Sequence, residues 1–518
     1  MTSHRLRRAS ALGAVSLLAG VGLVGLAAAP AYAVSVGTEG DLNTAIGNSE
    51  AVIDLTADIT LTSDISNITY PVTINGNGFE IDADGYDGFD FDLDTTEVAT
   101  LSGVSILDAD DAVAISLYDT ASITLTDVTV TNADEEAFYI YAEDDTSVTA
   151  SGLVGTGSEY GFYFESATGA DATFSVSDSS FTDNGNGLYF YGYGTSSGTV
   201  TDTDLSGNEY DGLYTDMYDD GMDLVVTGST MNNNGEYGVY LCDMSGTLLI
   251  ENSTIDNNSD TGIDGSIYSD DGGQFTLLGS TVSNNGAGGI DLSAYDEDAT
   301  FTMINSTVSG NDGEDYDEAA VQVSSDDYDG AGVFIYNSTI TANIEVWAGL
   351  YASYIPVEIS HSIVSGNEVN GYGDIWDDFA SSYDISWSIV DIYVQEAPAS
   401  GVDTASYVEG DGVIFSTEPG LGALADNGGP TLTHLPLDDS LALNAGDPDV
   451  AGEPETDQRG LERVSGTAID IGAVEVQEED ELAATGAETG AGIATGLALL
   501  TLGLGIVGIR LARRRQLA

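Results

Sequence analysis

A short phrase recurs through the middle of this chain, and its spacing limits the possible folds more than any other feature. The phrase is Ser or Thr, an apolar residue, two further residues and Asn, as in Thr254-Ile255 to Asn258. A period near 25 residues without long apolar runs indicates a solenoid, in which each repeat buries its apolar face against its neighbours. The closing asparagines lie 24 to 32 residues apart and are Asn184, Asn208, Asn234, Asn258, Asn285, Asn311, Asn343 and Asn367, with a looser copy ending at Asn132.

Each repeat holds three short strands separated by Gly, Asn and Asp, with no room for a helix between them. In one repeat the expected strands are 238–241, 247–250 and 253–255. This pattern predicts an all-β chain folded as a right-handed parallel β-helix. Asparagine tolerates the left-handed backbone of a sharp corner, and stacked amides can bond along a ladder. Roughly 13 coils at the strand spacing of about 4.8 Å would give a rod about 60 Å long.

The segments beside the repeats are expected to close the two ends of the rod, because a solenoid otherwise exposes unpaired strand edges. Residues 34–70 should form an N-terminal cap with a short helix, for which Thr38 is the N-cap, and the first strands. The coils occupy residues 71–395, and residues 396–477 form the C-terminal cap.

The N-terminus reads as a signal peptide, residues 1–33. Arg5, Arg7 and Arg8 precede an apolar run, and Ala31 and Ala33 supply the small residues of a signal peptidase site. The mature chain should therefore begin at Val34 and be exported.

The C-terminal segment, residues 478–518, combines a short motif with a possible membrane span. An uncharged stretch, residues 490–509, is long enough to cross a bilayer as a transmembrane helix, and the arginines after it favour the cytoplasmic side. The motif before this stretch consists of Leu482, Ala483, Ala484, Thr485 and Gly486. It resembles a Gram-positive cell-wall sorting signal, with Ala in place of the usual Pro, a variant familiar in actinobacterial proteins.

This resemblance implies that a sortase cuts after Thr485 and joins its carbonyl to peptidoglycan, so that membrane insertion is transient. The partners would then be the sortase and the cell wall. A plain C-terminal membrane anchor is the alternative.

Charge restricts the partners further. Lysine is absent, and residues 34–485 contain two arginines against 86 acidic residues, a formal net charge of −84. Such a field repels nucleic acid and anionic membranes. A purely solubilising role for these charges is equally compatible with the sequence. The single cysteine, Cys242, excludes an intrachain disulfide.

The region before the tail carries a second resemblance. Residues 426–434, 444–447, 456–460 and 470–475 resemble the "choice-of-anchor Q" region of bacterial β-helix surface proteins. The repeats also resemble the pectate-lyase-like superfamily, whose members include lyases and glycoside hydrolases.

Residues 53–393 contain no Arg or Lys. The resemblance would require a basic residue for a lyase, and an Arg-x-Lys element for a polygalacturonase, so we expect no enzyme and assign no catalytic residue. His361, His434 and Arg459 are interpreted as structural, with Asp447, Asp457 or Asp470 as the partner of Arg459.

Two surface features are candidates for binding. One tyrosine per repeat should face outward, because strand alternation turns its neighbours inward. This candidate ligand face consists of Tyr139, Tyr163, Tyr189, Tyr214 and Tyr240. Exposed aromatic patches often mark binding sites, whereas in-register stacking that stiffens the sheet is the alternative.

The second feature is a pair of acidic loops. Oxygen-rich loops suit Ca²⁺, the one candidate cofactor, although solvated turns would have the same composition. The candidate ligands are Asp312, Glu314, Asp315, Asp317, Asp326, Asp327 and Asp329. We therefore expect an exported, wall-anchored β-helical rod for adhesion or the display of a glycan-binding or Ca²⁺-binding surface. A wall-anchored polysaccharide lyase or glycoside hydrolase and an inert stalk are the alternatives.

Overall fold

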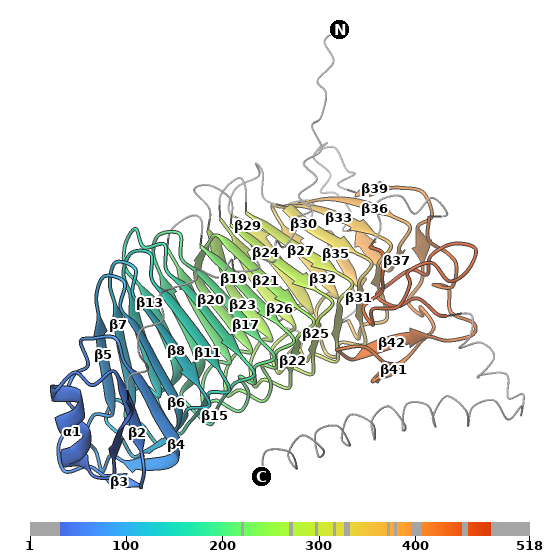
Figure 1. Cartoon of the computed structure of the whole chain (residues 1–518). Coiled ribbons are helices and arrows are strands. Elements are labelled where there is room, and N and C mark those ends of the chain that lie inside the picture. The colour runs from blue at the N-terminus through green and yellow to red at the C-terminus, as the bar shows by residue number, and fades with distance from the viewer. Residues whose placement is uncertain are drawn as a thin grey trace, which may run out of the picture.

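Each coil of the chain contributes strands to three faces of a rod (Figure 1). The computed structural model describes residues 32–218, 222–268, 273–295, 299–313, 318–325, 332–369, 373–377, 381–394, 407–447 and 454–477. In one coil the strands are β20 (Val239–Ser245), β21 (Thr247–Glu251) and β22 (Thr254–Asp256), all within one residue of the predicted strand starts.

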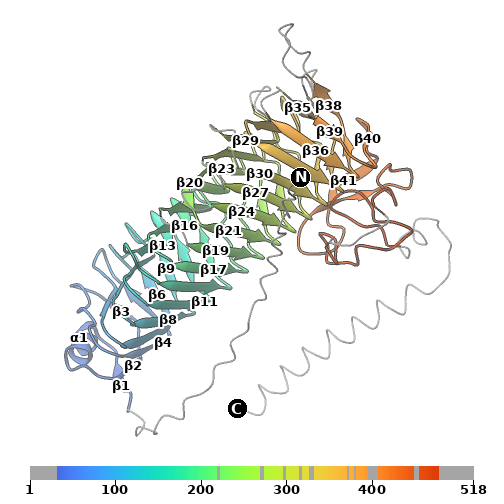
Figure 2. The ribbon, with the colours of Figure 1, turned by 90° about the horizontal axis from the view of Figure 1, so that it is seen from above.

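Every coil pairs in parallel with the next, so the strands run across the rod and the sheets run along it (Figure 2). Within the described residues the sheet that we call the front sheet has 13 strands, in agreement with about 13 coils. Its members are β5 (Phe89–Leu93), β7 (Val113–Leu117), β10 (Phe138–Ala142), β13 (Tyr160–Ser166), β16 (Asn186–Gly192), β18 (Leu213–Met217), β20, β23 (Ile263–Tyr268), β26 (Ile290–Ala294), β29 (Val321–Ser325), β32 (Leu350–Ser353), β35 (Ile375–Asp377) and β38 (Ile392–Val394).

The back sheet supplies the second face, and its shorter strands begin the third. Its members are β1 (Val34–Val36), β2 (Val52–Leu55), β3 (Ile59–Thr60), β4 (Thr73–Asp82), β6 (Val98–Leu107), β8 (Ser122–Thr126), β9 (Thr129–Thr131), β11 (Ser147–Ser151), β12 (Val154–Thr156), β14 (Thr173–Ser177), β15 (Ser180–Thr182), β17 (Ser197–Thr201), β19 (Asp223–Thr227), β21, β24 (Gln274–Leu278), β27 (Thr300–Ile304), β30 (Gly332–Tyr336), β33 (Pro356–Ser360), β36 (Ser382–Ser386) and β39 (Tyr407–Glu409).

The third face continues as the short sheet. Its members are β22, β25 (Thr281–Ser283), β28 (Thr307–Ser309), β31 (Thr339–Thr341), β34 (Ile363–Val364), β37 (Ile389–Val390) and β40 (Ile414–Phe415). These observations confirm the predicted all-β parallel solenoid.

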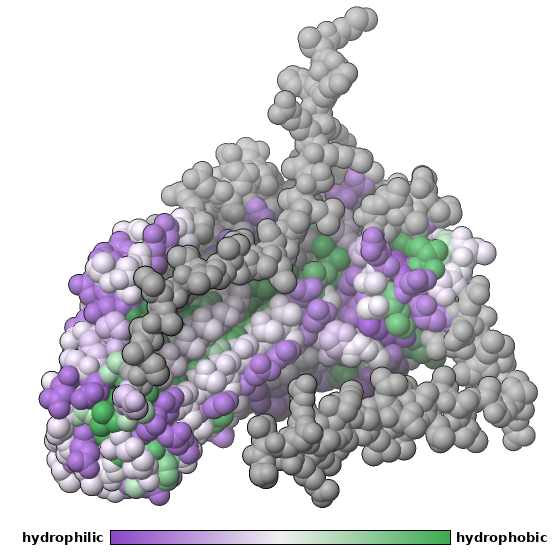
Figure 3. Space-filling model, viewed as in Figure 1, coloured by the Kyte–Doolittle hydropathy of each residue, from purple (hydrophilic) through white to green (hydrophobic). Residues whose placement is uncertain are grey.

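Alternation of side chains along each strand creates one continuous apolar core inside the coils. In β10, Phe138 and Ile140 are fully buried while Tyr139 and Tyr141 point outward. In the view of Figure 3, hydrophilic residues occupy much of the N-terminal end of the rod and part of the flank near the C-terminal region, with smaller hydrophobic patches among them. Burial of alternate residues is the main force that fixes the register, because a slip of one residue would turn every apolar side chain outward.

A ladder of buried asparagines closes one corner of the coils. The Nδ2 of Asn258 donates to the Oδ1 of Asn285 at 2.8 Å, and the Nδ2 of Asn234 donates to the Oδ1 of Asn258 at 2.9 Å. The same bond links the successive pairs from Asn208 to Asn367. The predicted amide ladder is therefore present.

The left-handed residue of this corner is not the ladder asparagine, contrary to our expectation. Asn257, one residue earlier, has φ of 58°, whereas the backbone of Asn258 is not left-handed. Asn132 also has φ of 58° and corresponds to Asn257, the left-handed residue of its coil. The next residue, Ala133, therefore occupies the ladder position in that coil. Two adjacent residues therefore share the corner: the first adopts the left-handed backbone that bends the chain, and the side-chain amide of the second donates along the ladder.

The first coil is covered by helix α1 (Glu39–Gly47), whose N-terminal turn is capped by Thr38. The Thr38 hydroxyl accepts a hydrogen bond from the Asp41 amide at 3.2 Å. Leu42, Ala45 and Ile46 are buried against the first strands. Because the helix lies across this end of the rod (Figure 1), it protects the edge of the first coil from pairing with another chain.

The C-terminal region packs along the flank of the last coils as well as near their end. It includes the antiparallel pair β41 (Leu421–Ala425) and β42 (Thr433–Pro436). Thr281 donates to the carbonyl of Leu432 at 2.7 Å, and Thr307 donates to the Oε1 of Gln458 at 2.6 Å. These partners on β25 and β28 lie several coils before the end, so the region covers the short sheet laterally.

Candidate ligand-binding face

The five predicted tyrosines form one column on the outer surface of the front sheet. Parallel pairing aligns Tyr139 with Tyr163, and the same register continues through Tyr189 and Tyr214 to Tyr240. All five are half-buried, because each ring lies against its neighbours while the residue before it points into the core. We call this column the tyrosine stripe.

The rings of the stripe stack on one another. The Tyr163 and Tyr189 rings have centroids 4.8 Å apart and an interplanar angle of 3°, and the Tyr189 and Tyr214 rings are 4.3 Å apart at 9°. Their faces are therefore covered, and a flat ligand cannot stack between them. Such stacking stiffens the sheet. Burial is also the largest cause that raises the pKa of Tyr189, to about 12.

One end of the stripe differs. The Tyr139 ring lies 5.5 Å from the Tyr163 ring at a tilt of 38°, but its neighbour in the preceding coil is the small residue Ala114. Its hydroxyl donates to Glu165 at 3.1 Å, which fixes the orientation of the ring. Among the described residues the ring of Tyr139 has no aromatic neighbour on the Ala114 side, so this end is the position where a ligand can contact a tyrosine face.

Beyond Tyr240 the same column changes from aromatic to acidic and then back to aromatic. Asp264 and Asp291 follow in register, and Gln322 donates to Asp291 at 3.0 Å. Burial, followed by repulsion from Asp291, raises the pKa of Asp264 to about 7. Tyr351 and Trp376 are next in register. Sequence reasoning missed this continuation because it followed tyrosines, although counting one coil onward from Tyr240 locates Asp264.

A second outward column contains a local irregularity. It runs from Tyr141 through Glu165 and Tyr191 to Asp216. At the next strand the register shifts: Leu241 pairs with Thr215, but Met244 pairs with Met217. Two residues of β20, Cys242 and Asp243, therefore stand opposite the single residue Asp216, which is a β-bulge. The same shift occurs against β23: Leu241 pairs with Gly265 and Met244 with Ile267, so Ser266 alone lies opposite the two bulged residues.

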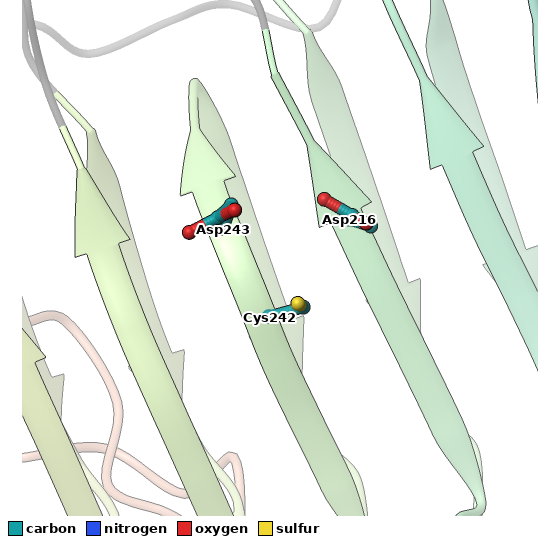
Figure 4. Close-up of side chains that lie close together, drawn as sticks. All are labelled: Asp216, Cys242 and Asp243. Carbon is teal, nitrogen blue, oxygen red and sulfur yellow. The ribbon is translucent and has the colours of Figure 1, made fainter.

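The bulge gathers three possible metal ligands. One ligand atom from each of Asp216, Cys242 and Asp243 lies within 4.8 Å of the other two. The carboxylate of Asp216 points toward the strand that carries Cys242 and Asp243 (Figure 4). In the sequence Cys242 is an isolated thiol, and the repeat spacing does not associate it with these carboxylates.

Asp216 is deeply buried for a carboxylate, with 4% of its surface exposed. Its Oδ2 accepts a hydrogen bond from the Tyr218 hydroxyl at 2.9 Å, whereas its Oδ1 has no hydrogen-bond partner among the described residues. A cavity of about 380 Å³ adjoins the cluster and is lined by Tyr218, Asp243, Ser245 and Tyr268.

Further carboxyl groups gather at the turns that precede the front sheet. Asp111, Glu135 and Glu136 lie within 4.8 Å of one another through one oxygen each. Burial, followed by repulsion from Asp111, raises the pKa of Glu136 to about 7. Burial likewise raises the pKa of Asp211 to about 7. Glu136 and Asp211 therefore hold a proton to higher pH than exposed carboxyl groups do.

His361, His434 and Arg459, which we interpreted as structural, each have a hydrogen-bond or ion-pair partner within the fold. His361 has φ of 51° at a corner, and its Nε2 accepts from the Asp447 amide at 3.0 Å. His434 is buried, bonded to Ser309 and to the Gly422 carbonyl, and burial lowers its pKa. Arg459 forms an ion pair with Asp457 at 3.0 Å, and of the three carboxylates proposed for it this is the one that it contacts.

Of the proposed calcium ligands, Asp312 alone is described. It takes part in a backbone bridge to Ile344 and is bonded through its amide and carbonyl. The other six fall outside the described residues, as do the sorting motif 482–486, the span 490–509 and Ala31. Ala33 is exposed. In the described part of the chain no helix is sufficiently long and apolar to span a membrane.

A family model described as a right handed beta helix region matches residues 113–266. Similar solved structures include the periplasmic alginate epimerase AlgG, at 11% identity and a TM-score of 0.41, covering 74% of this chain and 85% of that chain. The A-module of the Azotobacter vinelandii mannuronan C-5 epimerase AlgE4 has 14% identity and a TM-score of 0.40, covering 64% of this chain and 91% of that chain.

Pectate lyase Pel9A has 14% identity and a TM-score of 0.35, covering 68% of this chain and 88% of that chain. No curated protein matches the sequence. The family match spans six consecutive strands of the front sheet and the start of a seventh, from β7 into β23, and together with the stacked parallel coils it shows that this chain has the right-handed β-helix fold.

Proposed function

We propose that this chain is an exported, cell-wall-anchored β-helical rod that binds a ligand, a neutral glycan, along its front sheet. The anchoring part of the proposal is supported by the leader and by the motif at Thr485 with its apolar stretch and arginines. The observation that carries the binding part is the outer surface of the front sheet, where one register holds a run of five tyrosines, then two aspartates, and further along two more aromatic side chains.

The charges of this face favour a neutral ligand. The coils contain no Arg or Lys over residues 53–393, so an anionic polymer would meet carboxylates without compensating cations. A neutral glycan instead supplies hydroxyl donors to carboxylates such as Asp264 and Asp291. The open face of Tyr139 offers apolar contact for a sugar ring. The other tyrosines of the stripe, which stack on one another, hold the Tyr139 ring in place.

The test is a glycan-array screen of the purified chain, with and without Ca²⁺, followed by affinity measurements on two variants. Tyr139→Ala should weaken binding of a retained glycan by about five- to 30-fold, because an interaction of about 1–2 kcal/mol is lost. Tyr189→Ala is the matched control, since its ring faces are already covered, and it should change affinity less than Tyr139→Ala. An array without any bound glycan, or equal affinities for the two variants, would contradict the proposal.

An enzymatic role is the second candidate, and the pair Asp111 and Glu136 favours it. A carboxyl group with a pKa near 7 beside a second carboxyl group can act as a general acid. In that case the glycans retained on the array should be shortened during incubation, and Glu136→Gln should abolish the release of reducing ends. Intact glycans after incubation would leave binding as the function.

A further inference from the structure

We propose that Asp216, Cys242 and Asp243 bind a divalent transition-metal ion, with Zn²⁺ as the expected ion. The site lies on the outer surface of the front sheet, at the bulge in β20. It adjoins the tyrosine stripe, whose Tyr214 hydroxyl lies beside Cys242, but it does not depend on the proposed glycan binding.

The bulge creates the donor set. In a regular strand, Cys242 and Asp243 would point to opposite faces of the sheet. The register shift between Leu241 and Met244 instead leaves both residues half-exposed on the outside, while Met244 returns to the core. Asp216, opposite them on β18, completes three donors from two adjacent strands (Figure 4). Bulges of this kind often redirect a side chain at a functional site.

Burial makes the cluster unfavourable without a cation. Asp216 is 4% exposed, and its Oδ1 lacks a hydrogen-bond partner among the described residues. Burying a carboxylate oxygen without a partner is costly. The neighbouring donors, Cys242 and Asp243, are also acceptors or anions, and no Lys or Arg occurs in the coils. A bound cation would supply the missing partner of Oδ1 and offset the mutual repulsion of the three groups.

The chemistry of the donors indicates which cation fits. Calcium and magnesium prefer oxygen ligands only, whereas Zn²⁺ accepts thiolate sulfur together with carboxylate oxygen. Cys242 would bind the ion as a thiolate, because a coordinated thiol loses its proton.

The surroundings resemble a zinc site with an open position. Three protein ligands leave one position of a tetrahedral ion for water or an external ligand. Asp243 also lines the cavity of about 380 Å³, so the open position would face this space. Outside the donors, the Tyr218 hydroxyl holds the Oδ2 of Asp216 at 2.9 Å, which orients the carboxylate as outer-shell hydrogen bonds do in metal sites.

The experiment is a metal titration of the purified full-length protein after treatment with a chelator. Co²⁺ is the spectroscopic probe, because a cobalt–thiolate bond gives a charge-transfer absorption that carboxylates alone do not give. We expect this absorption to saturate at one Co²⁺ per chain and to disappear when Zn²⁺ displaces the cobalt. Zn²⁺ affinity is then measured by competition with a chelating dye.

Three variants separate the site from general anion binding. Cys242→Ser should abolish the absorption and weaken Zn²⁺ binding by about 100-fold or more, and Asp243→Asn should weaken it by about tenfold or more. Asp384→Asn removes an exposed carboxylate on β36 and should leave both measurements unchanged. Circular dichroism confirms that each variant is folded. Absence of the absorption in the wild-type protein, or equal Zn²⁺ affinity in wild-type and Cys242→Ser protein, would overturn the proposal.

Discussion

Replacing Asn258 by alanine tests whether the asparagine ladder stabilises the coils. The side chain of Asn258 is 2% exposed and takes part in four hydrogen bonds. Its Nδ2 donates to the Met231 carbonyl at 3.0 Å and to Asn285 at 2.8 Å. Its Oδ1 accepts from the backbone amide of Asn234 at 3.0 Å and from the Asn234 side chain at 2.9 Å.

The expected cost follows from the groups that lose their partners. Asn258→Ala leaves two buried donors of Asn234 unpaired, and each such group costs about 1–3 kcal/mol, so the coils should be destabilised locally by about 2–6 kcal/mol. Backbone strain does not contribute, because the left-handed residue is Asn257. In a solenoid the loss should concentrate in adjacent coils.

Hydrogen exchange followed by mass spectrometry measures this local loss directly. Peptides from β18 to β25 should exchange about 30-fold faster or more, the equivalent of about 2 kcal/mol. Asn257→Gly is the matched control: it removes an exposed amide at the next position, and glycine adopts φ of 58° without strain. If the two variants exchanged alike, or if exchange rose equally along the whole rod, the ladder would not be the source of stability.

Three further outcomes are expected. Thr485→Ala should move the protein from the wall fraction to the membrane and medium, and an unchanged amount of muramidase-releasable protein would refute sortase attachment. Because burial raises the pKa of Asp211 and Asp264 to about 7, above the unfolded value, both groups favour folding fully at low pH, and this contribution is lost as pH rises through 7. Urea denaturation should therefore show about 2–5 kcal/mol more stability at pH 5 than at pH 8, and a midpoint that rises with pH would contradict this. Millimolar Ca²⁺ should raise the melting temperature more than NaCl or Mg²⁺ at matched ionic strength if loop 312–318 binds it specifically, whereas equal shifts would indicate screening alone.

The repeat period was sufficient to predict the coils, because each coil needs only strands in which apolar and polar residues alternate and one asparagine buried at the corner. The predicted and observed strands of the coil from Val239 to Asp256 nearly coincide. The sequence did not show which asparagine bends the chain, since Asn257 and Asn258 are adjacent and either could adopt a left-handed backbone.

Two features of the structure could not be predicted from the sequence. The extra residue at Cys242 and Asp243 is hidden by the ordinary variation of repeat length, so the bulge cannot be distinguished from a longer turn. The lateral packing of the C-terminal region depends on bonds such as that between Thr281 and Leu432, which are 151 residues apart. Contacts at such separation leave no periodic trace in either segment.

The ladder bond between Asn311 and Asn343 spans 32 residues, yet its length of 2.8 Å equals that between Asn285 and Asn311, which spans 26. The corner thus keeps each coil in place however long the intervening loops are. In evolutionary terms, the scaffold separates stability from novelty: insertions can accumulate at one rim of the rod without loss of the stacked core. The same property makes that rim a suitable place to graft foreign epitopes or binding peptides at the regular spacing of the coils.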